Sequence, residues 1–341
     1  MDIKQQTAVL LTGLAAGAVL TRACIPPLRK IRTGRFEVYL GDRLKKDGSE
    51  PRMGGAVIFA AIVLGLAVGT AAGAAVRARE VLCLVMYLFM LTGVGFLEDI
   101  QKDTGGGPGM KDGYRLFIKL GASAGFCAVM KAFGHSCGVL VLPFRMGTVG
   151  LGAAEIPINA VLMTVLITAV EVHDCQRGYH GTGVDGLCLT SVTVGMLGLG
   201  AASAVINSSD DSAQLLALST AAACGAFLIW SMAPSKIYPG QSGSLLLGGA
   251  LGAAMILSSM HLGTFFCAAA MLADGACAAA EKLVFIKTKK LLLKGASLHE
   301  HLRALEWSEY KIIALAALLQ AAGAVGAAAM AVYESKLLIN N

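Results

Sequence analysis

Apolar runs of about twenty residues recur along the whole chain, and each is long enough to cross the roughly 30 Å hydrocarbon core of a bilayer as a helix. Ten such runs lie near residues 6–26, 53–75, 80–98, 115–134, 155–172, 184–206, 212–232, 243–260, 262–284 and 309–333. Only 15% of the 341 residues are charged, whereas soluble domains carry about 25%. A transmembrane barrel is excluded, because its strands alternate apolar and polar side chains. The pattern predicts an all-α, polytopic membrane protein.

Basic residues are concentrated in alternate loops, and this predicts the orientation. Loops 27–52, 99–114 and 285–308 are rich in lysine and arginine, whereas the loops between them on the other side carry few. By the positive-inside rule the rich loops are cytoplasmic, so ten crossings place both termini outside. The net charge of +6 then suits anionic lipid headgroups or phosphorylated substrates. Nucleic acid is a poor partner, because the basic residues are dispersed over membrane loops.

The chain is expected to form a single transmembrane domain, residues 1–341, because no polar stretch reaches the size of a soluble domain, about 50 residues. Irregular backbone is tolerated where it lines a water-filled cavity. Functional side chains are therefore expected in five cytoplasmic loops, near 27–52, 99–114, 173–183, 233–242 and 285–308. On the opposite side, segment 135–154 has glycine and proline breaks and predicts either a short β-hairpin or an interfacial segment.

Two adjacent carboxylates close the third apolar run. Glu98 and Asp99 are followed one turn later by Lys102. Carboxylates at the mouth of a membrane helix are costly unless they face water, a cation or a partner. The cluster suits Mg²⁺ shared with phosphate, or else a hydrated helix end with an i,i+4 Glu–Lys pair. On this stretch alone the helix end is the simpler interpretation.

The loop at 173–183 is unusually rich in titratable side chains. His173, Cys175 and His180 could be interpreted as a soft-metal site, but their spacing matches no zinc pattern. Asp185, which opens the sixth apolar run, is either a helix N-cap or a catalytic carboxylate.

The last two cytoplasmic loops carry groups suited to anions. Around Ser242 the start of a helix leaves backbone N–H groups that favour an anion, and a plain N-cap is the alternative. His299 and His301 could bind pyrophosphate or carry protons, or belong to a solvated turn. Asp274 is a carboxylate within an apolar run, either functional or paired with a polar group.

Taken in order, these loops resemble the polyprenyl-phosphate phospho-sugar transferases of the bacterial cell envelope. The resemblance covers nearly the whole chain. The matching segments are Lys-Lys-x-Gly before Met53-Gly54-Gly55, Gly95-Phe96-Leu97-Glu98-Asp99-x-x-Lys102, Asp174 with Asp185-Gly186-Leu187, Gly240-Gln241-Ser242-Gly243-Ser244-Leu245, and His299-x-His301 with Glu306-Trp307-Ser308-Glu309. The last segment is similar to the branch that transfers phospho-N-acetylmuramoyl-pentapeptide more than to the N-acetylglucosaminyl-phosphate branch.

The resemblance implies an activity, a metal and partners. A phospho-sugar, phospho-N-acetylmuramoyl-pentapeptide or a related group, would move from a UDP-linked amino sugar to undecaprenyl phosphate and release UMP, in peptidoglycan or envelope polymer synthesis. The reaction would use Mg²⁺ in a cleft on the cytoplasmic face of the bacterial inner (plasma) membrane. The implied partners are these substrates, membrane lipid, and a second subunit in a homodimer or in a heterodimer with a homologue.

The resemblance also implies roles for individual residues. The expected catalytic residues are Glu98, Asp99, Lys102, Asp174 and Asp185. The expected substrate contacts are Lys46, Tyr238 (stacked on uracil), Ser242, His299 and His301. The expected metal ligands are Glu98, Asp99, Gln241 and Glu171.

The chain departs from the family pattern inside the expected site. Gln241 stands where the family has a metal-binding aspartate, Glu98 replaces the first aspartate of the pair, and Glu171 replaces an asparagine. Glu300 replaces the middle histidine, and about eight residues are inserted between Asp174 and Asp185. The sequence therefore leaves two hypotheses. One is an active transferase with a rearranged Mg²⁺ site. The other is a catalytically impaired paralogue that binds lipid phosphate or nucleotide-sugar, or regulates an active homologue.

Overall fold

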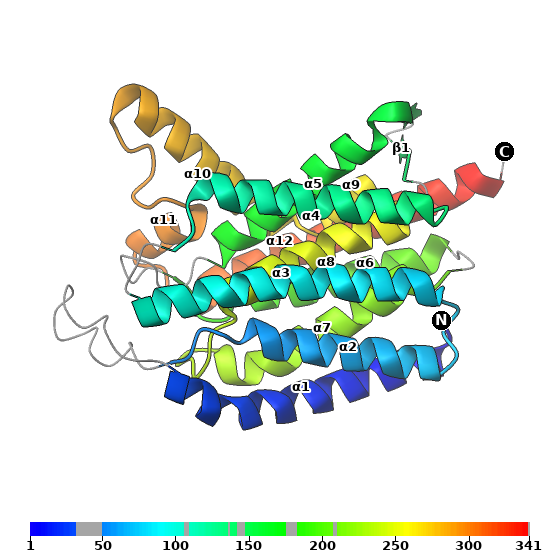
Figure 1. Cartoon of the computed structure of the whole chain (residues 1–341). Helices are drawn as coiled ribbons and strands as arrows, with labels where there is room; N and C mark the ends of the chain where they lie inside the picture. Colours follow the sequence, from blue (N-terminus) through cyan, green and yellow to red (C-terminus); the bar gives the residue numbers. More distant parts are fainter. Residues whose placement is uncertain are drawn as a thin grey trace.

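The chain folds into a bundle of long helices (Figure 1). The computed structural model describes residues 1–31, 50–105, 109–135, 137–141, 147–174, 183–206 and 210–339. The helices are α1 (Ile3–Ile31), α2 (Gly55–Ala71), α3 (Ala78–Gly105), α4 (Asp112–Ala132), α5 (Glu155–His173), α6 (Leu187–Ile206), α7 (Ser212–Ser231), α8 (Gly240–Ser258), α9 (His261–Phe266), α10 (Ala269–Thr288), α11 (Leu298–Ala304) and α12 (Glu309–Ile339).

Each of the ten apolar runs is helical, so the prediction of an all-α polytopic membrane protein is confirmed. Seven of the described helices are long and apolar enough to cross a membrane. The other three runs contain α2, which has 17 residues, and α4 and α10, which carry buried charged side chains such as Lys119 and Asp274. The number of crossings and their orientation remain predictions.

The ninth run differs from the predicted single helix, because the chain breaks between α9 and α10. The first N–H groups of α10 need an acceptor at this break, and Ala270 N–H donates to Gln320 Oε1 of α12 at 3.0 Å. Gly323 of α12 lies against the carbonyl of Phe266, where a Cβ atom would come within 1.9 Å of the oxygen. The break is thus stabilised by a neighbouring helix, which the apolar pattern of the run does not encode.

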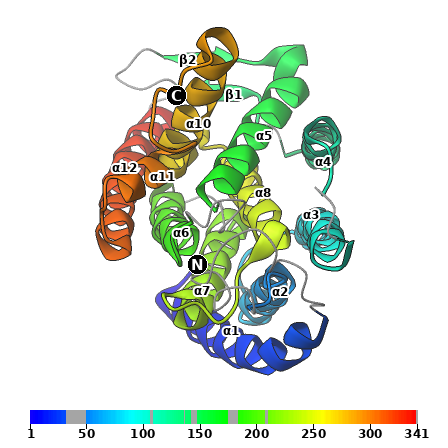
Figure 2. The ribbon, with the colours of Figure 1, turned by 90° about the vertical axis from the view of Figure 1, so that its left-hand side faces the viewer.

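Helix α8 lies at the centre of the bundle, ringed by α2, α3, α5, α6 and α7 (Figure 2). Within α8, 94% of an 18-residue apolar stretch is buried inside the protein. Glycines permit this close packing, because a Cβ at Gly248 would come within 2.5 Å of Ile167 Cα, and one at Gly95 within 2.5 Å of Ser242 Cα. The second contact brings the start of α8 against the last turns of α3.

The two ends of the bundle differ in character. Both chain ends lie at one end, together with an antiparallel hairpin of β1 (Val139–Val141) and β2 (Thr148–Gly150) (Figure 1). The hairpin is one of the two structures predicted for this segment. The other end, called the site end below, carries the last turns of α3 and α5, the start of α8, and α11. The carboxylates singled out from the sequence gather there.

Candidate active site

Glu98, near the end of α3, is a buried carboxylate that holds two cations. The residue is 1% exposed. Oε1 accepts from Lys102 Nζ at 2.8 Å and from the Arg115 guanidinium of α4 at 2.5 Å. The predicted Glu–Lys pair is therefore present, and Arg115 is a partner that the sequence interpretation missed. Among the described residues, Oε2 of Glu98 is a buried oxygen without a hydrogen-bond partner.

Asp99, the next residue, points the other way and binds the start of α8. Its carboxylate accepts from the backbone N–H of Gln241 at 2.8 Å, the N–H of Ser242 at 3.0 Å and the Ser242 hydroxyl at 2.8 Å. The N-terminus of a helix favours an anion. The predicted anion-binding position at the start of α8 is thus held by a carboxylate of the protein itself, and a substrate anion at Ser242 stays a prediction.

The turn before α8 places these donors. Gly240 has a φ of +77°, a backbone conformation that favours glycine. A Cβ at Gly240 would come within 1.6 Å of the Arg52 carbonyl oxygen and 2.5 Å of Asp99 Oδ2. Because Gly240 has no side chain, the backbone of Arg52 and the carboxylate of Asp99 can both lie against this turn.

Glu171, on the last turns of α5, links three helices. One carboxylate oxygen accepts from Lys119 Nζ of α4, and the other accepts from the Gln241 side-chain amide of α8, both in short contacts. Lys119 is 4% exposed and also donates to Thr168 Oγ1 at 3.0 Å. Sequence interpretation missed Lys119, although a lysine inside an apolar run is by itself a signal of a specific partner.

The four predicted metal ligands do not fit Mg²⁺ as a set. Mg²⁺ requires oxygen atoms that converge on one point with room for several waters or phosphates. Asp99 is turned onto the start of α8, Glu98 holds Lys102 and Arg115, and both oxygens of Glu171 accept hydrogen bonds. Mg²⁺ use remains an expectation from the resemblance.

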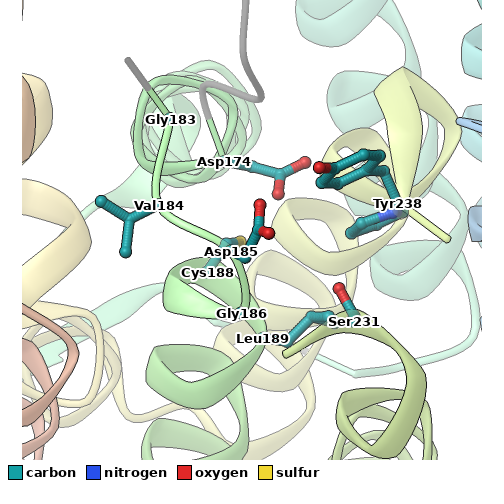
Figure 3. A pocket seen from close by; sticks show the side chains of 10 residues that line it. Asp174, Gly183, Val184, Asp185, Gly186, Cys188, Leu189, Ser231 and Tyr238 are labelled. Atoms are coloured by element: carbon teal, nitrogen blue, oxygen red, sulfur yellow. The ribbon is translucent and has the colours of Figure 1, made fainter. Parts of the chain in front are cut away.

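Asp174 and Asp185 line a small pocket at the site end. Their carboxylates point toward each other, and that of Asp174 also faces the hydroxyl end of Tyr238 (Figure 3). Asp174 accepts from the Ser244 hydroxyl in a short contact, and Asp185 accepts from the N–H of Ser235 at 3.2 Å. The pocket thus brings together three of the predicted site residues: Asp174 from the end of α5, Asp185 from the turn before α6 and Tyr238 from the turn before α8.

The predicted histidine of α11 and the carboxylate within α10 form a separate buried network. Asp274 Oδ2 contacts Nδ1 of His173 at 2.9 Å and Nδ1 of His299 at 2.5 Å, and Oδ1 accepts from the N–H of Leu298 at 2.7 Å. Nε2 of His173 lies 2.9 Å from Ser191 Oγ. Asp274 is therefore paired, as one of its two predicted alternatives required. His299 is 3% exposed, which differs from an open pyrophosphate contact.

The remaining predicted residues are spread around this end. His301 is half-buried, and its Nδ1 accepts from the N–H of Lys294 at 3.1 Å. Glu300 accepts from the N–H of Ala296 at 2.7 Å, and so helps to fix the start of α11. Lys46 lies outside the described residues, as do Cys175 and His180 of the soft-metal alternative.

Comparison with known proteins identifies the family to which this arrangement belongs. A model of glycosyl transferase family 4 matches residues 81–259, just over half of the 341 residues. The chain belongs to this family. The matched segment runs from α3 to the end of α8, so it contains Glu98, Asp99, Glu171 and the three pocket residues.

Proteins named phospho-N-acetylmuramoyl-pentapeptide-transferase are similar to this family 4 chain over most of its length. The one from Nostoc sp. is 27% identical, with 90% of this chain and 81% of the relative covered. The one from Gloeothece citriformis is 29% identical, covering 93% and 84%. The one from Clostridium beijerinckii is 29% identical, covering 90% and 91%. The chain is thus a divergent member, as the resemblance implied.

Proposed function

We propose that the protein transfers a phospho-sugar, phospho-N-acetylmuramoyl-pentapeptide or a related group, from a UDP-sugar to undecaprenyl phosphate in the bacterial plasma membrane. An oxygen of the lipid phosphate forms a bond to the sugar-bearing phosphorus of the donor. The bond from that phosphorus to the bridging oxygen breaks, and UMP leaves with the electron pair. Catalysis of phosphoryl transfer is largely positioning and neutralisation of charge, which are roles that fixed side chains can supply.

The pocket of Asp174, Asp185 and Tyr238 is the observation that carries this proposal. It combines an aromatic ring with two carboxylates and lies within the segment that matches the family. Aromatic rings stack on nucleobases, and carboxylates accept from ribose hydroxyls and base N–H groups. We assign the uridine end of the donor to this pocket.

Two cations at the same end of the bundle suit the phosphates. Lys102 and Arg115 are both held by Glu98 Oε1, and their side chains are 31% and 23% exposed. They are thus anchored at one end and within reach of solvent at the other. Guanidinium and ammonium groups bind phosphate oxygens through charge-assisted hydrogen bonds. In this proposal Glu98 and Asp99 position the cations and the start of α8, and Lys102 holds a phosphate.

Transfer itself is the experiment that tests the proposal. The protein is purified in detergent and given UDP-N-acetylmuramoyl-pentapeptide, undecaprenyl phosphate and Mg²⁺, and UMP release is measured. We expect turnover that Asp185→Asn lowers by about tenfold or more, because a hydrogen bond to a charged group contributes about 1.5–3 kcal/mol. Asp2→Asn is the matched control, because Asp2 is exposed at the opposite end of the bundle, before α1.

The same assay separates the enzyme from the impaired paralogue. Donor or lipid binding without UMP release, in a protein that melts cooperatively, would contradict the proposed transfer and favour the binding or regulatory role. A homodimer or a heterodimer with an active homologue would then be sought by mixing the two proteins and measuring the transfer rate of the homologue.

A further inference from the structure

Lys119 is a charged side chain deep in the helix bundle that the proposed transfer does not use. Its side chain is 5% exposed. An ammonium group away from water is destabilising unless a carboxylate and further acceptors surround it. Glu171 and Thr168 of α5 supply these acceptors. The position of Lys119 is therefore fixed, because the neighbouring helix provides its partners.

The side-chain amide of Gln241 is a further partner of the Glu171 carboxylate. It donates to the second oxygen of Glu171, so the carboxylate lies between an ammonium from α4 and an amide from α8. An aspartate in place of Gln241 would bring a second negative charge against Glu171, and one lysine would then face two carboxylates. The neutral amide and the buried lysine thus match each other.

Three of the acids at this end already have positive partners. Four acids, Glu98, Asp99, Glu171 and Asp174, lie close to the start of α8, and Asp174 accepts from the Ser244 hydroxyl. Three cations, Lys102, Arg115 and Lys119, contact two of these acids directly, while Asp99 binds the positive end of the α8 dipole. A divalent ion on Glu171 would bring a second positive charge against the buried Lys119 ammonium, and an ammonium displaced by the ion would remain buried without its carboxylate.

We propose that the Lys119 ammonium group takes the place of a metal ion beside Glu171, and that Lys119 and Gln241 together prevent Glu171 from binding a divalent metal ion. Lys119 acts as a positioning residue: it neutralises Glu171 and fixes α4 and α5 against the start of α8. The consequence of this inference for transfer rests on the proposed function. In that reaction, the positive charge that neutralises Glu171 belongs to a side chain of the protein and not to a bound ion. The central claim of the inference is that Glu171 binds no divalent ion, and measurements of metal binding test this claim independently of transfer.

The first test measures binding of Mn²⁺, a spectroscopic substitute for Mg²⁺, to the full chain in detergent by electron paramagnetic resonance. A neutral double variant, Lys119→Met with Glu171→Gln, removes the pair without leaving either partner charged and buried. We expect it to bind Mn²⁺ as the natural protein does. Binding by the natural protein that this variant weakens by about tenfold or more, the scale on which metal sites respond to altered ligand shells, would overturn the proposal.

The second test opens the site. Lys119→Met with Gln241→Asp leaves Glu171 beside a second carboxylate and without its cation. We expect Mn²⁺ affinity to rise by about tenfold or more over the natural protein; no rise in a variant that still melts cooperatively would contradict the inference. Lys131→Met is the matched control, because Lys131 pairs with Glu155 at 2.6 Å between the same two helices, at the other end. It should leave Mn²⁺ affinity unchanged.

Turnover provides the link to transfer. If the natural protein releases UMP, the Lys119→Met, Gln241→Asp variant should release it about tenfold more slowly or slower still, because the charges around Glu171 have changed. A natural rate that EDTA abolishes, together with Mn²⁺ bound through Glu171, would overturn the proposal. If no UMP is released at all, the proposed function fails, and the Mn²⁺ measurements still decide whether Lys119 closes the site.

Discussion

At the scale of single residues, the pocket depends on the ring of Tyr238. Stacking of a base on an aromatic ring contributes about 1–3 kcal/mol. Tyr238→Ala is therefore expected to raise the KM for the UDP-sugar by about five- to hundredfold, with a smaller effect on kcat, because the ring binds ground state and transition state alike. Steady-state kinetics of UMP release with varied donor provide the measurement.

Tyr310→Ala is the matched control for that prediction, because Tyr310 is 62% exposed at the start of α12. It should leave KM unchanged. Equal effects of the two substitutions would argue against uridine binding at Tyr238, and a fall in kcat without a change in KM would assign the ring to the chemical step.

Motif residues were easier to predict than their partners. Glu98, Asp99, Asp174 and Asp185 stand out in the sequence because carboxylates at the ends of membrane helices are costly without a partner, whereas Tyr238 was predicted through the resemblance to the family. Their hydrogen-bond partners could not be read in the same way. Asp99 binds a helix that starts more than 140 residues later, and such a contact follows from how helices pack and not from spacing along the chain.

At the scale of elements, the approach of α3 to α8 depends on a missing side chain. Gly95→Ala would place a Cβ within 2.5 Å of Ser242 Cα and 2.6 Å of the Gln241 carbonyl oxygen, both backbone atoms. We expect the two helices to separate, at a loss of about 1–3 kcal/mol in the free energy of unfolding, and UMP release to fall because Asp99 loses its donors. Thermal unfolding in detergent measures the first effect.

Gly93→Ala is the control on the same helix, because a Cβ there has no neighbour within 4 Å. It should change the free energy of unfolding by less than about 0.5 kcal/mol, with a gain favoured by the helix propensity of alanine. Similar losses from both substitutions would mean that glycine is needed for reasons other than contact with α8.

The element boundaries show where an apolar pattern stops being informative. It located the long helices, because long apolar runs have few alternatives in a bilayer. It did not locate the break between α9 and α10, since Gln320 and Gly323, which stabilise the break, belong to a helix about fifty residues further on.

At the scale of the whole molecule, the orientation in the membrane can be tested. The positive-inside rule places the site end in the cytoplasm and the β-hairpin outside. A membrane-impermeant maleimide added to intact cells should therefore label Thr148→Cys of β2, and should label Lys290→Cys beyond α10 only after permeabilisation. Both positions are exposed. Labelling in the opposite order would invert the predicted topology.

The central position of α8 also bears on how the protein is made. Of the seven candidate spans among the described residues, α8 has the lowest mean hydropathy, 1.3, and the largest buried share, 94%. A segment of low hydropathy partitions poorly into lipid by itself. The helices α2, α3, α5, α6 and α7, which surround it, all precede it in the chain. During synthesis α8 is therefore made after these five helices, and it can pack against them instead of against lipid.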